Sequence, residues 1–181
     1  MTARENAENS PASAKHHHRG EARRSVPCCV ITVSDTRTPE TDTGGRLLAE
    51  LLEGGGHTVV GREIVKDEPD AIRGALDAAL ARDGVGAVLL TGGTGVAPRD
   101  VTPDSVAPRL DREIPGFGEI FRALSYAEIG SAALLSRALA GIADGRVVIV
   151  LPGSRGAIRL GVEKLVLPEL GHLAAEAVKT R

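Results

Sequence analysis

A stretch rich in glycine and threonine, at residues 91–100, carries groups that are suited to binding phosphate. It reads Thr-Gly-Gly-Thr-Gly-Val-Ala-Pro-Arg-Asp and directly follows the apolar residues 88–90. Glycine lets the backbone turn tightly and approach a ligand closely, and successive amides in such a turn form a concavity that attracts anions. The stretch therefore predicts a phosphate-binding loop, and a plain strand-to-helix turn is the alternative. The candidate contacts are its first five residues, Thr91, Gly92, Gly93, Thr94 and Gly95.

Two carboxylates accompany this loop, Asp67 and Asp100. A carboxylate repels phosphate, so the pair makes chemical sense if a cation lies between them and the phosphates. Mg²⁺ is bound in this way, by one or two protein carboxylates together with phosphate oxygens. Asp67 and Asp100 are therefore the candidate catalytic residues and the candidate Mg²⁺ ligands. Two structural alternatives stay open, because Asp67 could cap the helix that follows it and Asp100 could cap a turn.

Two further polar loops follow apolar runs. Pro152, Gly153 and Ser154 precede a predicted helix, where unpaired amides and the helix dipole favour a second anion. Ser154 could cap that helix, with or without an anion contact. Ser34 and Asp35 follow the first apolar run, and they either contact the ligand or stabilise their own loop.

Apolar runs that alternate with amphipathic segments position these loops. We expect strands over 28–33, 57–65, 86–90 and 147–151, and helices over 43–53, 69–82, 103–110, 118–125, 131–140 and from 155 to about 179, the last kinked or divided by Pro168. Residues 115–118 are expected to form a turn, and 103–145 a helical insertion between the third and fourth strands. Strands alternating with helices imply parallel pairing and right-handed crossovers. The expected fold is therefore a three-layer α/β/α domain with a mostly parallel central sheet, over residues 26–181.

In an open parallel sheet, ligands bind outside the carboxyl ends of the strands, where the strand order reverses. All four polar loops leave predicted strands at those ends, so we expect them to form one crevice. Two anion sites and two carboxylates indicate phosphoryl or nucleotidyl transfer. Residues 91–100 lack the Gly-Lys-Ser/Thr ending of a Walker loop. They also lack the Rossmann glycine spacing, which disfavours hydride transfer.

Composition excludes several other classes. A net charge of −2 and 2% aromatic residues give no sign of a nucleic-acid partner. No apolar run reaches the ~18 residues of a membrane span, and we expect no signal peptide. Residues 1–25 are polar, small and charged, which predicts a disordered tail. We expect His16, His17 and His18 in this tail to be solvated and not to bind a metal ion. Cys28 and Cys29 are expected to be buried free thiols of a cytoplasmic protein.

Six segments resemble the MoaB and MogA family of molybdenum cofactor biosynthesis proteins, which also includes the gephyrin G domain. They occur in order, with compatible spacing, over nearly all of residues 28–178. The first and the fourth are closer to the MoaB branch. They are residues 33–37 (VSDTR), 91–95 with Arg99 and Asp100, 115–119 (PGFGE), 124–130 (LSYAEIG), 136–138 (SRA) and 151–154 (LPGS).

The resemblance implies adenylylation of molybdopterin, in which the pterin phosphate attacks the α-phosphate of ATP, Mg²⁺ assists and pyrophosphate leaves. Asp67 and Asp100 match the two functional aspartates of the family, and residues 91–95 with Gly153 and Ser154 match its contacts to the pterin phosphate. The resemblance also implies a homotrimer, which can pair into a hexamer in the MoaB branch. It implies that a molybdenum-insertion protein of the MoeA type receives the product.

Two other functions remain open. Some members of the MoaB branch are suspected of binding the pterin without catalysis, so the chain could be a non-catalytic pterin carrier or scaffold. A related fold also occurs in pyrophosphatases of the competence-damage type, although these have a differently spaced acidic pattern after their glycine loop.

Overall fold

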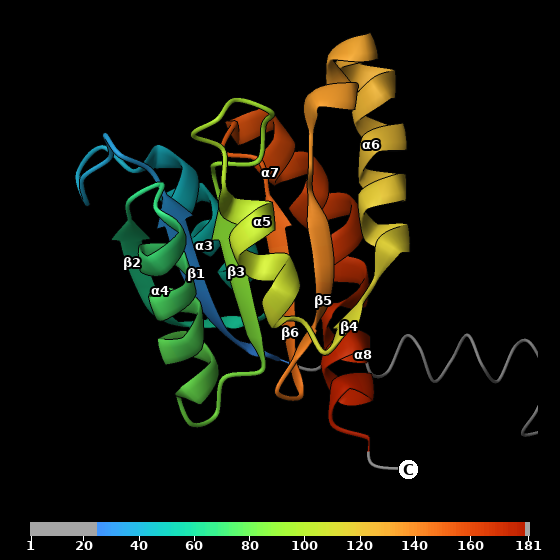
Figure 1. Cartoon of the computed structure of the whole chain (residues 1–181). Helices are drawn as coiled ribbons and strands as arrows, with labels where there is room; N and C mark the ends of the chain where they lie inside the picture. The colour runs from blue at the N-terminus through green and yellow to red at the C-terminus, as the bar shows by residue number, and fades with distance from the viewer. Residues whose placement is uncertain (1–24, 180–181) are drawn as a thin grey trace, which may run out of the picture.

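The structure is a computed structural model that describes residues 25–179. The tail predicted over 1–25, with its three histidines, therefore lies outside the described residues except for Ser25. The described chain folds into one six-stranded sheet with the strand order β2-β1-β3-β6-β5-β4, covered by helices on both faces (Figure 1). This arrangement confirms the predicted three-layer α/β/α fold.

The strands are β1 (Pro27–Val33), β2 (Thr58–Val65), β3 (Ala87–Thr91), β4 (Arg112–Glu113), β5 (Leu139–Ala143) and β6 (Arg146–Leu151). The helices are α3 (Thr43–Gly54), α4 (Pro69–Ala81), α5 (Thr102–Val106), α6 (Pro115–Ile129), α7 (Arg155–Gly161) and α8 (Leu167–Ala177). Two 3₁₀ turns, η1 (Ala107–Arg109) and η2 (Gly130–Leu135), and a π-helical segment, η3 (Val162–Val166), complete the described elements.

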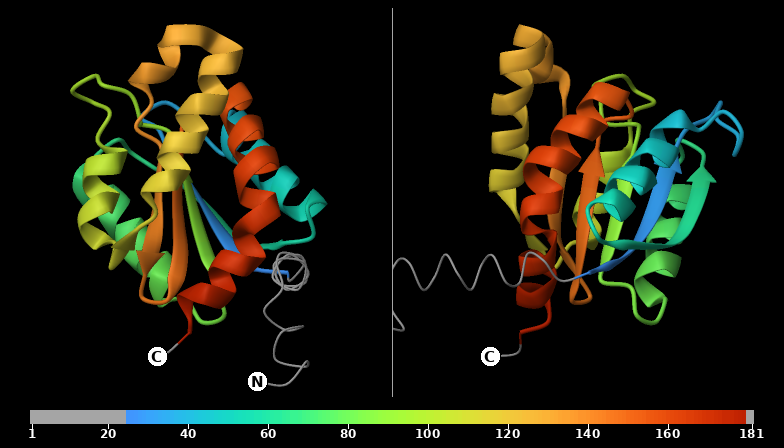
Figure 2. Two further views of the ribbon diagram at one scale, coloured as in Figure 1. Left: turned by 90° about the vertical axis from the view of Figure 1, so that its right-hand side faces the viewer. Right: turned by 180° about the vertical axis from the view of Figure 1, so that it is seen from behind.

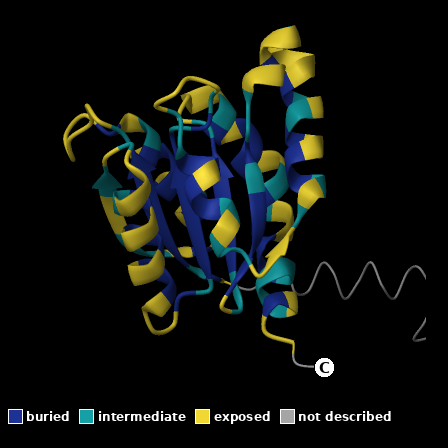
Figure 3. Ribbon diagram, in the orientation of Figure 1, coloured by how far each residue is buried: buried dark blue, intermediate teal, exposed yellow. Residues whose placement is uncertain are grey.

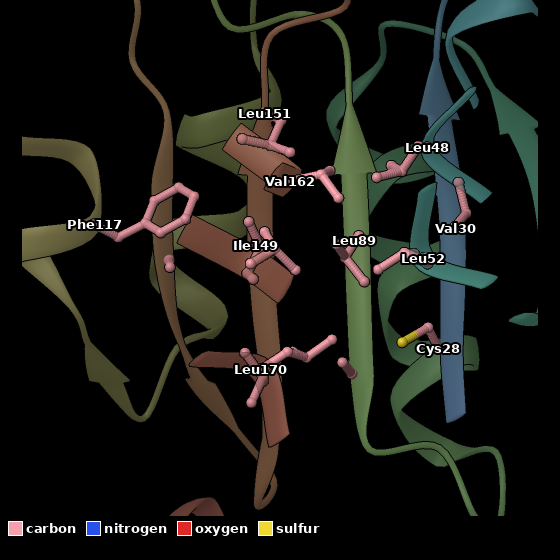
Figure 4. Close-up of a cluster of buried hydrophobic side chains, with 14 of the residues drawn as sticks. Cys28, Val30, Leu48, Leu52, Leu89, Phe117, Ile149, Leu151, Val162 and Leu170 are labelled. Atoms are coloured by element: carbon pink, nitrogen blue, oxygen red, sulfur yellow. The ribbon is translucent and has the colours of Figure 1, made fainter. Parts of the chain in front are cut away.

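Four strands, β2, β1, β3 and β6, run parallel and correspond to the four predicted strands. Their side chains alternate between two apolar cores. On one face, Cys28, Val30, Leu89 and Ile149 pack against α3, α7 and α8 (Figure 4). On the other face, the neighbouring strand residues pack against α4 and α5. Figure 2 shows the helical segment of α7 and α8 crossing the first of these faces.

The two cysteines point to opposite faces of β1, and both are buried and free, as predicted. Burial, and to a lesser extent the neighbouring Cys29, raises the pKa of Cys28 to about 12. Since the thiolate is the reactive form of cysteine, Cys28 acts as a small apolar core residue.

Helix α3 begins at Thr43, the residue at which the sequence predicts it to start, and Asp42 is its N-cap. The Asp42 carboxylate accepts a hydrogen bond from the Gly45 amide (2.8 Å) and another from Thr32 Oγ1 (2.9 Å). Arg62 on β2 pairs with the same carboxylate at 3.3 Å. This buried cap therefore fixes α3 to β1 and β2 just below the edge at which the polar loops emerge.

The predicted helical insertion over 103–145 is wrong in part. It contains two strands, β4 and β5, which pair antiparallel, and β5 also pairs antiparallel with β6. The helix predicted over 131–140 is instead η2 followed by β5. The alanine-rich sequence of this segment favours a helix locally. Pairing with β6 on one side and β4 on the other holds residues 139–143 in a strand instead. A Cβ added to Gly141 would lie 2.5 Å from the Arg112 carbonyl oxygen.

The turn predicted at 115–118 is also wrong, because these residues form the first turn of α6. Proline is preorganised for that position, and Phe117 stacks on Phe121 one turn later with ring centroids 6.4 Å apart. Pro168 was predicted to kink or divide the last helix, and the π-helical segment η3 does separate α7 from α8, ending two residues before this proline. Within residues 25–179, none of the helices combines the length and the apolar character that crossing a membrane requires.

His57 makes the stability of the fold depend on pH. The ring is buried just before β2, and its Nδ1 accepts a hydrogen bond from the Val26 amide at 3.2 Å. Burial lowers the pKa of His57 below its ordinary value. The neutral ring therefore contributes its full stability above about pH 6.5, and that contribution falls as the pH drops from there toward the lowered pKa of the folded state.

We expect urea titrations to show a larger loss of unfolding free energy between about pH 7.5 and about pH 5.5 in the wild type than in His57→Gln. The variant removes the ionisable ring and keeps a hydrogen-bond acceptor. Equal losses in the two proteins would contradict this assignment.

Candidate functional site

The polar loops emerge together at the carboxyl edge of the four parallel strands (Figure 1). The strand order reverses between β1 and β3. The chain leaves β1 toward α3 on one face of the sheet and leaves β3 toward α5 on the other. Because these two loops separate to opposite faces, they leave a crevice at the place where open parallel sheets bind ligands.

Glycines let three of the loops meet at this crevice. Gly92 and Gly93 have φ angles of +109° and +58°, in the region that favours glycine. A Cβ on Gly92 would overlap the carbonyl oxygen of Val33, at the end of β1. A Cβ on Gly153 would lie 3.3 Å from Gly92 Cα, so the loops after β1, β3 and β6 approach backbone to backbone.

A hollow of about 250 Å³ opens between these loops. It is lined by the ends of β1 and β3, the loop after β1, the start of α3 and Gly153. A second hollow, of about 550 Å³, adjoins it at Ser34 and Arg37 and extends toward the end of β2. Together they have the size expected of a site for a small phosphorylated ligand.

Both predicted carboxylates lie against the glycine loop. A Cβ on Gly93 would lie 2.8 Å from Asp67 Oδ1, and one on Gly95 would lie 2.6 Å from Asp100 Oδ2. Burial raises the pKa of Asp67, and the charges of Asp35 and Asp100 raise it further. These two carboxylates therefore place negative charge beside the backbone amides of the glycine loop, although neither of them lines the two hollows.

The structure separates the alternatives for these two residues. Glu68, without a side-chain hydrogen bond, occupies the N-cap position of α4, so Asp67 does not cap that helix. Asp100 does close a turn, because its Oδ2 accepts a hydrogen bond from the Ala97 amide (3.0 Å) and its amide donates to the Ala97 carbonyl (2.9 Å).

Two other residues that were predicted to contact the ligand make hydrogen bonds within their own segments. Ser34 Oγ accepts hydrogen bonds from the amides of Thr36 and Arg37, both at 3.3 Å. Ser154 Oγ caps α7 through the Ala157 amide, also at 3.3 Å. These two hydroxyls therefore stabilise their own segments.

The remaining predicted residues link the loops to one another. Thr91 Oγ1 donates to the Pro152 carbonyl at 3.1 Å and so joins the loops after β3 and β6. Asp35 Oδ1 accepts from the Asp67 amide at 3.2 Å and joins the loops after β1 and β2. Thr94 is buried, and its carbonyl accepts a hydrogen bond from the Arg137 amide at 3.0 Å.

Sequence reasoning missed the role of Arg137, which lies between η2 and β5. Its Nε donates to the Gly95 carbonyl at 2.8 Å, its Nη2 donates to the Asp100 carbonyl, and its Nη1 pairs with Asp104. This one guanidinium therefore holds the glycine loop against the start of α5. Its partners lie 33 to 42 residues away in the chain, so local spacing gives no signal for the contact.

Thr102 was missed as well. It is fully buried, and among residues 25–179 its Oγ1 has no hydrogen-bond partner. A Cβ on Gly93 would lie 2.5 Å from this oxygen, next to Asp67. An unpaired buried hydroxyl costs free energy, so its place beside the glycine loop indicates a site that a bound group can complete.

The sequence of the chain is similar to those of proteins that bind or help to make molybdopterin. Residues 29–172 match the family described as a probable molybdopterin binding domain. The chain is 51% identical over 165 residues to the molybdenum cofactor biosynthesis protein B of Halalkalibacterium halodurans, covering 91% of this chain and 97% of that one.

Solved structures agree with the sequence comparison. The tungsten cofactor synthesizing protein MoaB from Pyrococcus furiosus superposes with a TM-score of 0.78 at 38% identity, covering 86% of this chain and 99% of the other. A structure of MogA superposes with a TM-score of 0.76 at 30% identity, covering 86% and 100%. The identities are higher with the MoaB proteins than with MogA.

Proposed function

The chain belongs to the molybdopterin-binding domain family of molybdenum cofactor biosynthesis proteins, and on that premise we propose that it is a molybdopterin adenylyltransferase. Its sequence lies closer to the MoaB branch than to MogA. The proposed reaction transfers AMP from ATP to the terminal phosphate of molybdopterin in the cytoplasm. The observation that carries the proposal is the glycine loop with Asp67 and Asp100 set against it.

The reaction needs no nucleophile from the protein, because an oxygen of the pterin phosphate attacks the α-phosphorus of ATP and the bond to the β-phosphate oxygen breaks. The protein has to hold two anions in line and neutralise charge. Amides of Gly92, Gly93 and Gly95 would bind the pterin phosphate. The backbone contacts of Gly92 and Gly153 fix the distance between the loops after β3 and β6, so both substrates are held by a rigid frame.

The residues at the site fit Mg²⁺ bound together with substrate phosphates. Within residues 25–179, no group of three or more His, Cys, Asp or Glu side chains could hold a metal ion by itself. Mg²⁺ needs only one or two carboxylates when phosphates supply its other ligands, and Asp67 and Asp100 would provide these. When bound, Mg²⁺ would offset the charge that develops on the phosphates.

The direct test mixes the purified protein with molybdopterin, ATP and Mg²⁺ and measures pyrophosphate. We expect stoichiometric release of pyrophosphate and formation of adenylyl-molybdopterin, with neither product when Mg²⁺ is chelated. Pterin binding without nucleotide binding or pyrophosphate release would reject the transferase and support a non-catalytic carrier of the same pathway. If the transferase reaction is observed, we propose that its product, adenylyl-molybdopterin, passes to a metal-insertion protein of the MoeA type.

We also propose that the protein is a homotrimer, or a hexamer of two trimers, and that α6 and η2 form the contact. Large apolar side chains are exposed along this segment, whose far end projects from the domain (Figure 3). Several large exposed apolar side chains on one segment are typical of an interface. These side chains are Ile120, Tyr126, Ile129, Leu134 and Leu135.

We expect Leu134→Asp to lower the molar mass in light scattering, because Leu134 is 79% exposed and a charge there would have to be desolvated in the interface. Val178→Asp is the matched control, since Val178 is also exposed (68%) but lies just beyond α8. An unchanged assembly in Leu134→Asp, or a monomeric wild type, would reject this interface.

A further inference from the structure

Arg99, in the loop after β3, reaches across to the loops that follow two other strands. Its Nε lies 2.8 Å from Asp35 Oδ2, its Nη2 lies 2.9 Å from Asp35 Oδ1, and the same Nη2 lies 3.7 Å from Glu68 Oε1. The Arg99 side chain is 59% exposed, and that of Asp35 is 35% exposed. Ion pairs that are exposed to solvent contribute little to stability, so Arg99 can change partners at little cost.

The surroundings of Arg99 are acidic. The carboxylates of Asp35, Glu68 and Asp67 raise the pKa of Arg99, and Arg99 in turn lowers the pKa of Asp35. A polyphosphate entering the crevice would meet these carboxylates and Asp100. Without a compensating cation at that position, the negative charges would repel the polyphosphate.

We propose that Arg99 is the receptor for the β- and γ-phosphates of ATP, and that Asp35 holds it in place until they arrive. This inference rests on the proposed function, which assigns ATP to the site. Phosphate oxygens accept the bidentate guanidinium contact as carboxylate oxygens do. Arg99 lies four residues after Gly95, in the same loop as the amides that would hold a phosphate. When Arg99 moves, the Asp35 carboxylate becomes free beside Asp67 and can join it in binding the divalent cation of ATP.

The proposal predicts opposite effects for the two partners of the ion pair. Arg99→Gln removes the cation that receives the phosphates, so we expect the dissociation constant for ATP in EDTA to rise about tenfold. Asp35→Asn removes both a repelling charge and the competitor for Arg99, so we expect tighter ATP binding in EDTA. The asparagine keeps an Oδ1 that can accept the hydrogen bond from the Asp67 amide.

The measurement is calorimetric titration of ATP, and separately of AMP, into each full-length protein in EDTA and in Mg²⁺. Arg109→Gln is the control. Arg109 also pairs with two carboxylates, those of Asp77 and Asp144, but near the edge of the sheet opposite to the polar loops. We expect this variant to bind ATP like the wild type. We expect Arg99→Gln to lose more affinity for ATP than for AMP, which lacks the β- and γ-phosphates.

If both Arg99→Gln and Asp35→Asn weaken ATP binding in EDTA, where no divalent cation needs Asp35, the ion pair is only a brace between loops and the proposal is overturned. Equal losses for ATP and AMP would overturn the assignment to the β- and γ-phosphates. These results would leave the transferase standing. A wild type that binds no ATP in either buffer would reject the transferase, and the role of Arg99 with it.

Discussion

We expect Asp100→Asn to lower the rate of pyrophosphate release by about 100-fold or more, with the fold intact. The size of the effect is that of removing one group that stabilises charge in a closed site. Asp100 has two roles in the structure, since its Oδ2 closes the turn with the Ala97 amide while the carboxylate faces Gly95. Asparagine keeps an oxygen for the turn and removes the charge, so it separates these roles.

Asp100→Ala completes the comparison, because alanine removes the charge and the turn contact together. If the charge matters for the reaction, both variants lose activity to a similar extent. If only the turn matters, Asp100→Asn retains nearly wild-type turnover, which would contradict the proposed role. Asp70→Asn is the control, since Asp70 is an exposed carboxylate in the first turn of α4 that pairs with Arg73 on its own helix.

The parallel half of the sheet could be predicted from sequence because three of its strands, β1, β3 and β6, are mainly apolar runs that end in polar loops. The rule that ligands bind at the carboxyl ends then brought Asp67, Asp100 and the glycines to one edge, where the structure places them. The antiparallel half was missed for a physical reason. Strand β4 has two residues, and β5 is a short alanine- and glycine-rich segment whose conformation depends on pairing with β6.

The polar network of the site was harder to predict. Arg99 and Asp35 are 64 residues apart, and Arg137 meets the glycine loop from 42 residues away. Such pairs depend on the path of the backbone, and the residue types allow many other pairings. The same holds for Thr102, whose buried unpaired hydroxyl becomes evident only once α5 is placed beneath the glycine loop. Residues that hold the loops of the crevice in place through long-range contacts are therefore harder to predict from the sequence than residues that line the crevice.

Gly92→Ala should be the most damaging single-methyl substitution at the crevice. The φ angle of +109° is unfavourable for alanine, and the added Cβ would overlap the Val33 carbonyl oxygen. Backbone strain of about 1–2 kcal/mol and overpacking of about 1–3 kcal/mol together predict a loss of about 3 kcal/mol in unfolding free energy. Relief of the clash requires the loops after β1 and β3 to separate, so ligand binding should fall as well.

The matched control is Gly74→Ala, on the exposed face of α4, where a Cβ would meet nothing within 4 Å. There we expect a gain of about 0.5–1 kcal/mol, because alanine favours helix more than glycine does. Urea denaturation measures both changes, and titration with ATP and Mg²⁺ shows whether the site survives in Gly92→Ala. A Gly92→Ala protein with wild-type stability would show that the loops after β1 and β3 can move apart freely. The close backbone contact between them could then not be what holds the two substrates in line.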